Sequence, residues 1–137
     1  MATRIKAYID TSAFIAFLDR SDSFHPLFLQ LFSEPPSLVT TPLVIAEGQG
    51  WFLRRYDVTR ALQFMNFIES LKPLTIYPVG KKEIQEATRY LRRFSDEELT
   101  LADTTGLWLM TKQKTDQCWS TDRHLGLTGK SLIIHER

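Results

Sequence analysis

Residues 5–14 read IKAYIDTSAF, and this stretch decides how the chain begins to fold. The apolar residues from Ile5 to Ile9 predict a strand that enters a hydrophobic core. The strand ends on Asp10, although a carboxylate is strongly unfavourable in a core when it has no partner. Whether Asp10 is only a local folding signal therefore depends on where the other acids of the chain stand.

Length and composition predict one globular domain that covers residues 1–137. The chain is of ordinary single-domain size and can bury a substantial core. Apolar residues make up 43% and charged residues 24% of the chain, as in ordinary globular proteins. The longest apolar run, Ala13–Leu18, is far shorter than the roughly 20 residues that span a bilayer, so we expect no membrane helix.

The N-terminal segment and the cysteine content favour a cytoplasmic protein. The N-terminal segment MATRIKAY lacks the apolar stretch of a secretion signal. Cys118 is the only cysteine, so no intrachain disulfide can form, and we expect a buried thiol on a strand. Lysine and arginine total 17 against 16 acids, which excludes the strongly basic composition of many nucleic-acid binders but not a local basic patch.

Short β-rich runs alternate with longer helical stretches, a pattern typical of βα units in an α/β fold. We predict a central parallel sheet of about five strands flanked by helices. The predicted strands cover residues 5–9, 38–40, 74–79, 117–120 and 132–135. The predicted helices cover residues 12–18, 26–32, 42–56, 58–71, 81–94 and 101–114.

Four acids stand at positions that predict a shared site. Asp10 and Asp122 follow predicted strands, and ligands of open parallel sheets bind outside the carboxyl ends of the strands. Glu47 and Asp103 lie in predicted helices with apolar residues on both sides. Converging carboxylates repel, and the ordinary remedy is a hard divalent cation, Mg²⁺ or Mn²⁺. Because magnesium is usually held together with substrate phosphates, this pattern predicts phosphoryl transfer.

Most of these acids also have a local structural explanation. Asp10 could cap the following helix, and Asp103 could form a capping box with Thr100. Asp122 could start a turn. Glu47 lies beyond the first turn after Pro42 and gains little from the helix dipole. A single metal site accounts for all four positions, whereas the local explanations are separate.

The four motifs resemble, in order and spacing, the acidic motifs of PIN domains, in particular the VapC-type toxin ribonucleases. They are YIDTSAFIA with Asp10, TTPLVIAEG with Glu47, LTLADTTGLWLM with Asp103 and WSTDRHL with Asp122. The resemblance implies a PIN-like α/β fold and Mg²⁺- or Mn²⁺-dependent hydrolysis of RNA. It also implies a homodimer and a small antitoxin protein that holds the toxin inactive.

The resemblance also assigns roles to individual residues. Asp10, Asp103 and Asp122 would coordinate the metal, and Glu47 would complete the catalytic site. Thr11, Ser12 and Thr121 match polar positions that can bind the carboxylates or the scissile phosphate, and Arg123 could contact a phosphate.

Gly48 and Gly50 follow Glu47 where relatives more often have larger helix formers. Each glycine costs about 1 kcal/mol in a helix relative to alanine. Either this helix packs unusually close to a neighbour, or it is irregular at these positions.

Three other features lie outside the predicted site. His124 is left out because its position alone does not bring it into the pocket. The arginine and aromatic residues of segments 51–56 and 89–94 suit RNA binding, but amphipathic packing explains most of them. The predicted helix 58–71 is apolar over much of its circumference, which indicates core packing plus an oligomer or partner interface.

Two alternatives remain beside the nuclease. A phosphatase of the haloacid dehalogenase type or a receiver domain also places Asp at the end of its first strand. The phosphatase needs a second Asp where Ser12 stands, and a receiver needs acids in the preceding segment TRIKAYI, which has none. The other alternative is a catalytically silent PIN-like protein that binds RNA or a partner.

Overall fold

The first strand occupies the interior of a parallel sheet. The computed structural model describes residues 5–136, in which the strands β1 (Lys6–Ile9), β2 (Ser37–Thr40), β3 (Leu74–Ile76) and β4 (Gln117–Trp119) pair in parallel in the order β3-β2-β1-β4. Residues 1–4, which belong to the segment MATRIKAY in which we expect no secretion signal, and residue 137 lie outside the described residues. All parallel strands therefore end at one edge of the sheet, as the βα pattern predicted.

The prediction of a fifth strand at residues 132–135 is wrong. Within residues 5–136 the sheet has four strands, and Leu132 makes only an isolated parallel bridge to Cys118. The chain then turns into the short 3-10 helix η2 (Ile133–His135). Leu132 and Ile133 are both buried, and a short apolar run does not by itself distinguish an edge strand from a buried helical turn. The third strand also ends earlier than predicted, because Pro78 has no N–H to donate to a ladder.

All six predicted helices are present, with ends within one residue of the predicted ones. They are α1 (Thr11–Leu18), α2 (His25–Leu31), α3 (Pro42–Arg55), α4 (Val58–Ser70), α5 (Lys81–Arg93) and α6 (Leu101–Gln113). A further 3-10 helix, η1 (Arg123–Gly126), follows β4. The helix starts match their chemistry: Pro42 begins α3, and Asp57 accepts a hydrogen bond from the N–H of Arg60 at the start of α4.

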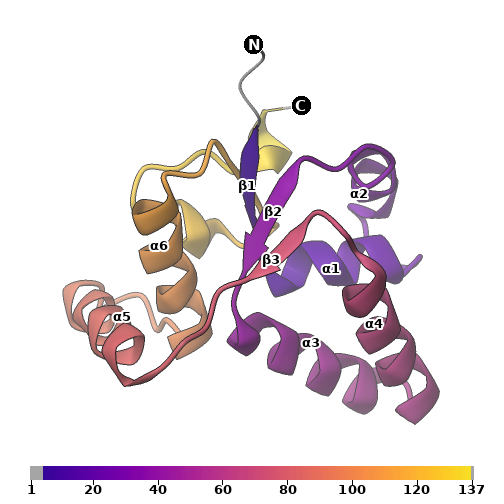
Figure 1. Ribbon diagram of the computed structural model, residues 1–137, viewed down its shortest axis with the longest axis horizontal. Helices are drawn as coiled ribbons and strands as arrows, with labels where there is room; N and C mark the ends of the chain where they lie inside the picture. Colours follow the sequence, from indigo (N-terminus) through magenta and orange to yellow (C-terminus); the bar gives the residue numbers. More distant parts are fainter. Residues whose placement is uncertain (1–4, 137) are drawn as a thin grey trace.

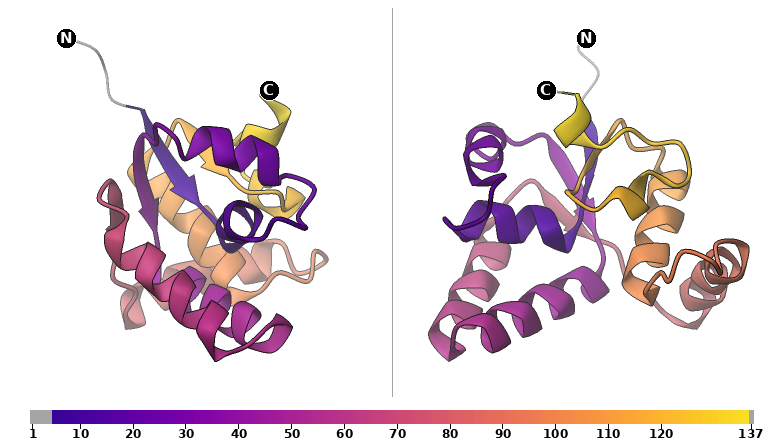
Figure 2. Two further views of the ribbon diagram at one scale, coloured as in Figure 1. Left: turned by 90° about the vertical axis from the view of Figure 1, so that its right-hand side faces the viewer. Right: turned by 180° about the vertical axis from the view of Figure 1, so that it is seen from behind.

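Helices cover both faces of the sheet. Figure 1 shows α5 and α6 on one side and helices α1 to α4 on the other, and the left view of Figure 2 shows α1 and α2 in front of the sheet with the orange α6 behind it. Ala7, Tyr8 and Ile9 of β1 are fully buried because both faces of this strand are covered. Cys118 is buried on β4, as predicted.

An aromatic cluster joins α1 to α4. The ring of Phe14 packs edge-on against Phe64 and Phe67, with ring centroids 5.9 Å and 6.3 Å apart. Leu62 of α4 remains exposed on the opposite side of this helix. The apolar pattern of segment 58–71 is therefore largely explained by the core, and its role as an interface stays a prediction.

Gly48 explains why α3 and α4 lie so close together. A Cβ atom added at Gly48 would lie 2.9 Å from Cε1 of the buried Phe64 ring on α4, and it would meet Cζ of that ring at even shorter distance. The helix α3 is continuous through Gly48 and Gly50. Close packing, not irregularity, accounts for Gly48.

We expect Gly48→Ala to lower the free energy of unfolding by about 1–3 kcal/mol, because the new methyl group overpacks α3 against Phe64. Urea unfolding measures this change. Gly126→Ala is the matched control, because a Cβ atom there meets nothing within 4 Å. Equal stability of the two variants would contradict this account of the helix packing.

Candidate active site

The four predicted acids line one hollow at the carboxyl edge of the sheet. Asp10 joins β1 to α1, Asp122 stands between β4 and η1, Glu47 lies on α3, and Asp103 lies in the first turn of α6. The hollow has a volume of about 340 Å³. Its lining residues are Asp10, Thr11, Ser12, Ile15, Glu47, Trp51, Arg54, Thr100, Asp103 and Asp122.

Asp10 is the most deeply placed of these acids. Its side chain is only 5% exposed, and its Oδ2 accepts hydrogen bonds from the hydroxyls of Ser12 (3.0 Å) and Ser120 (3.1 Å). Burial raises the pKa of Asp10 to about 6, and the negative charge of Asp103 adds to this rise, while the hydrogen bonds oppose it. A cation beside Asp10 would remove this burial penalty.

Two serines tie the turn after β1 to the turn after β4. The hydroxyls of Ser12 and Ser120 lie 3.1 Å apart. The N–H of Thr121 donates to Ser12 Oγ (3.0 Å), and the N–H of Asp122 donates to Ser120 Oγ (2.9 Å). Asp10 and Asp122 are thus held in one polar network, in which Thr121 takes part through its backbone.

Glu47 is exposed and is oriented by Thr11. The hydroxyl of Thr11 lies 2.6 Å from Glu47 Oε1 and 3.3 Å from the carbonyl oxygen of Val44. Because α3 is regular, Glu47 stands one turn beyond Val44 on the helix face that borders the hollow. This contact is of the kind expected for Thr11.

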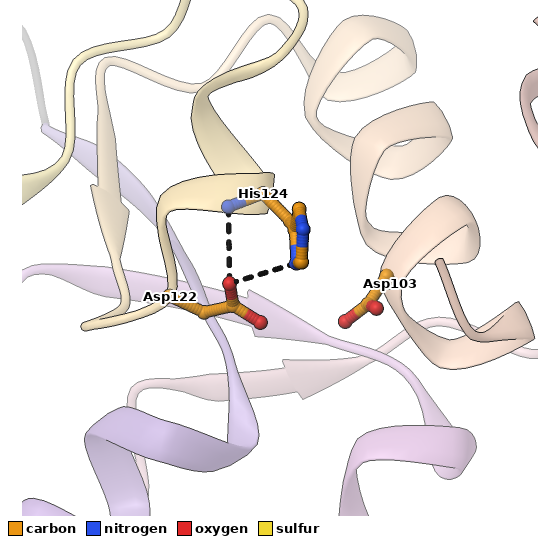
Figure 3. Close-up of side chains that lie close together, drawn as sticks. All are labelled: Asp103, Asp122 and His124. Atoms are coloured by element: carbon orange, nitrogen blue, oxygen red, sulfur yellow. Dashed lines mark hydrogen bonds and ion pairs between the residues drawn. The ribbon is translucent and has the colours of Figure 1, made fainter. Parts of the chain in front are cut away.

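Asp103 forms the capping box that the sequence indicated and faces the other acids as well. Its N–H donates to Thr100 Oγ1 (3.1 Å), and its Oδ2 accepts from the N–H of Thr100 (3.0 Å). Figure 3 shows the Asp103 carboxylate facing Asp122 and His124. The local explanation of Asp103 and its place in the hollow are therefore compatible.

His124 joins the acids, although sequence reasoning left it out. Asp103, Asp122 and His124 each offer one ligand atom, and these atoms lie within 4.8 Å of one another. The Nδ1 atom of His124 lies 3.1 Å from Asp122 Oδ1, which also accepts from the N–H of His124 (3.0 Å). His124 thus holds Asp122 in place. The signal in the sequence was the spacing of two residues, which a single 3-10 turn brings together.

Arg123 does not line the hollow. Its side chain is 77% exposed and forms a long ion pair of 3.8 Å with Glu97. Arg54 and Trp51 of α3 line the hollow instead. The sequence had placed both in the mixed arginine and aromatic segment 51–56 without assigning them to the site.

The donor set suits a hard divalent cation. Four carboxylates and one guanidinium line the hollow, so it carries an excess of negative charge that an RNA phosphate would avoid. Carboxylate and hydroxyl oxygens are the ligands that magnesium and manganese prefer. The residues present therefore fit an ion of this type.

Comparison with known proteins shows which proteins this chain resembles. No family model matches the sequence. Ribonuclease VapC26 of Mycobacterium tuberculosis (strain ATCC 25618 / H37Rv) is 26% identical over 116 residues, which cover 84% of this chain and 85% of that protein. The crystal structure of M. tuberculosis VapC20, described as a sarcin-ricin loop cleaving toxin, superposes with a TM-score of 0.84 at 21% identity, over 93% of this chain and 98% of that one. The chain therefore has the fold of the VapC toxins, and it resembles a VapC ribonuclease in sequence over most of its length.

A second solved structure has the same fold. VapBC2 of Rickettsia felis, crystallised with a DNA fragment from its promoter, matches this chain with a TM-score of 0.65 at 11% identity, over 93% of this chain and 96% of that one. The predicted α/β fold with a parallel sheet is confirmed, with four strands in place of five. Among residues 5–136, every helix is too short or too polar to cross a membrane.

Proposed function

We propose that this chain is a PIN-domain endoribonuclease that hydrolyses RNA phosphodiester bonds with Mg²⁺ or Mn²⁺, as the toxin of a toxin–antitoxin pair. The observation that carries the proposal is the convergence of four carboxylates from four separate segments on one hollow. The ribonuclease name of VapC26 and the RNA-cleaving description of VapC20 support the choice of RNA as substrate.

Asp10, Asp103 and Asp122 would hold the ion. When bound, the ion offsets charge on the phosphate and makes a water molecule more acidic. The hydroxyls of Ser12 and Ser120 both donate to one oxygen of Asp10 and so keep this carboxylate in place at the hollow. His124 keeps Asp122 in place through two contacts to the same oxygen.

Glu47 is suited to orient the attacking water or to accept its proton. It is exposed to the hollow, and the hydroxyl of Thr11 fixes one of its oxygens. The N–H of Thr121 and the hydroxyl of Ser12 belong to the network that positions the acids. Arg123, on the outer rim, would contact a phosphate of the RNA outside the hollow.

A partner protein and a second copy of the chain complete the proposal. The VapBC2 structure supports an antitoxin that binds the toxin. The exposed Leu53, Val58 and Leu62 at the α3–α4 turn suit a homodimer contact. The reducing cytoplasm suits a chain whose only cysteine is buried and unpaired.

The test is cleavage of RNA by the purified chain with Mg²⁺ or Mn²⁺ and with a chelator in place of metal. We expect Asp103→Asn to reduce cleavage at least about a hundredfold, because a metal ligand is lost. Its amide oxygen still accepts from Thr100, so the fold is kept. Cleavage that persists in chelator or in Asp103→Asn would contradict the proposal.

Asp57→Asn is the matched control for this experiment. Asp57 also opens a helix by accepting a backbone hydrogen bond, and asparagine caps a helix equally well, but Asp57 does not line the hollow. Its cleavage rate should equal that of the wild type. A catalytically silent PIN domain would bind RNA in this assay without cutting it and would show no rise in melting temperature with millimolar Mn²⁺.

A further inference from the structure

One face of α3 borders the hollow over two helical turns. Glu47, Trp51 and Arg54 are spaced four and three residues apart, so they lie on the same side of the helix. All three line the hollow. Gly50 lies three residues from Glu47 and four from Arg54, and it belongs to this face as well.

The side chain of Arg54 lies over Gly50. A Cβ atom added at Gly50 would be 3.0 Å from Nη1 and 3.6 Å from Cζ of Arg54. Long side chains of a helix lean toward its N-terminus, over the residue four positions earlier. Here that direction leads toward Glu47 and the acids. Because Gly50 has no side chain, the guanidinium of Arg54 has room to lie at the rim of the hollow.

The Arg54 guanidinium is not neutralised by the acids beside it. Within residues 5–136 no carboxylate oxygen lies within 4.0 Å of its nitrogens, and no hydrogen bond from its side chain is found. It is the one basic side chain among the residues that line the hollow in the described part of the chain. Its planar set of donors matches phosphate oxygens.

We propose that Arg54 is a substrate-positioning residue that binds a backbone phosphate of the RNA next to the scissile one, and that Gly50 leaves its guanidinium the space to do so. This inference rests on the proposed ribonuclease function. The backbones of Glu47 and Arg54 are about 10 Å apart along the helix axis, and the guanidinium leans back from there over Gly50, about 4.5 Å along the axis from Glu47. A bound metal ion would offset the charge of the scissile phosphate, whereas Arg54 would bind the adjacent phosphate of the RNA backbone.

The test measures binding of a short fluorescent single-stranded RNA as a function of salt, in the Asp10→Asn background so that cleavage does not interfere. We expect Arg54→Ala to weaken binding about tenfold. Loss of one phosphate contact should also reduce the slope of log affinity against log salt by about 0.7. Arg54→Lys keeps the charge and should restore the slope, but only part of the affinity.

Arg55→Ala is the matched control. Arg55 is the next residue of α3, its guanidinium lies 5.4 Å from the centre of the Tyr56 ring, and it does not line the hollow. Arg55→Ala should leave the slope of log affinity against log salt unchanged. In the enzyme with intact acids, Arg54→Ala should raise KM with little change in kcat, because the contact is made equally before and during the reaction.

Gly50→Ala provides an independent test that leaves every charge in place. The new methyl group would lie 3.0 Å from Nη1 and would shift the guanidinium by a few tenths of an ångström, so RNA binding should weaken, but less than in Arg54→Ala, while the melting temperature stays equal or rises because alanine favours a helix. If the wild type binds and cleaves RNA but Arg54→Ala and Arg55→Ala bind RNA equally well, the proposed role of Arg54 is wrong and the proposed ribonuclease function stands. A wild type that neither binds nor cleaves RNA overturns the proposed function and this inference together.

Discussion

Asp10→Asn is expected to remove RNA cleavage and at the same time to stabilise the metal-free protein. Asp10 is buried, and three other carboxylates share its hollow. Replacing it with a neutral side chain of the same shape removes the cost of a buried charge, while its amide oxygen still accepts from Ser12 and Ser120. Loss of a metal ligand should slow cleavage on the order of a thousandfold.

The size of the stabilisation follows from the pKa of Asp10. Burial raises this pKa from 3.8 to about 6, which corresponds to about 3 kcal/mol of unfolding free energy at neutral pH. Between these two values the folded protein keeps a proton that the unfolded chain has released. The metal-free wild type should therefore lose stability as pH rises from about 4 to 6. Asp10→Asn should lack this loss and exceed the wild type by about 1–3 kcal/mol at pH 7.

Asp19→Asn is a control for which we expect the opposite change in stability. Asp19 is likewise only 5% exposed. Burial acts to raise the pKa of Asp19, but hydrogen bonds from Ser21 and Tyr56 outweigh it and lower the pKa. We expect Asp19→Asn to destabilise the protein. Thermal unfolding in chelator compares the variants, and a melting temperature of Asp10→Asn below that of the wild type at pH 7 would refute this account of the site.

The second large effect is expected from Gly106→Ala in α6. A Cβ atom at Gly106 would meet the hydroxyl of Tyr8 and would lie 2.7 Å from its Cζ. Tyr8 is fully buried on β1 and has little room to move. We expect a loss of about 3 kcal/mol in the free energy of unfolding.

Gly106→Ala should also slow cleavage, because it changes the distance between two acids. Asp10 follows Tyr8 by two residues, directly after the end of β1, and Asp103 and Gly106 lie three residues apart on α6. A methyl group that pushes α6 from β1 therefore moves Asp103 from Asp10. Cleavage should fall at least tenfold in protein that remains folded, because catalytic groups must be held closely in position.

Tyr8→Phe tests the same contact between β1 and α6 from the side of β1. The Tyr8 hydroxyl is buried and has no hydrogen-bond partner among residues 5–136. Removing it should stabilise the protein by about 1 kcal/mol. It should also relieve part of the clash in Tyr8→Phe/Gly106→Ala, with a favourable coupling of about 1 kcal/mol between the two substitutions. Additive effects of the two substitutions in urea unfolding would show that Gly106 and Tyr8 do not set the spacing of α6 and β1.

Local chemistry in the sequence was sufficient for the helices and for the choice of the four acids. The helix starts at Pro42, Val58 and Leu101 depend on proline and on capping side chains within a few residues, so they could be read directly. The acids were noticeable because one shared metal site accounts for all four positions, whereas the local explanations for Asp10, Asp103 and Asp122 are separate and leave Glu47 unexplained. That Asp10 and Asp122 meet followed from the common edge at which parallel strands end.

Only the tertiary structure decided the features that depend on packing between distant segments. The apolar pair Leu132 and Ile133 is compatible with a strand or a helical turn, and burial against the core selected the turn. Whether Gly48 marked close packing or an irregular helix depended on Phe64, sixteen positions away.

In the candidate site, too, the sequence determines the residue types and the tertiary structure determines their arrangement. The residues DRH at 122–124 look equivalent in sequence, but the turn of η1 directs His124 to Asp122 and leaves Arg123 exposed toward Glu97. The sequence by itself determined which side chains carry the charge, because charge belongs to the residue type. The tertiary structure determined which of those charges share a hollow, because the direction of a side chain depends on the backbone turn that carries it and on the neighbours that exclude other directions.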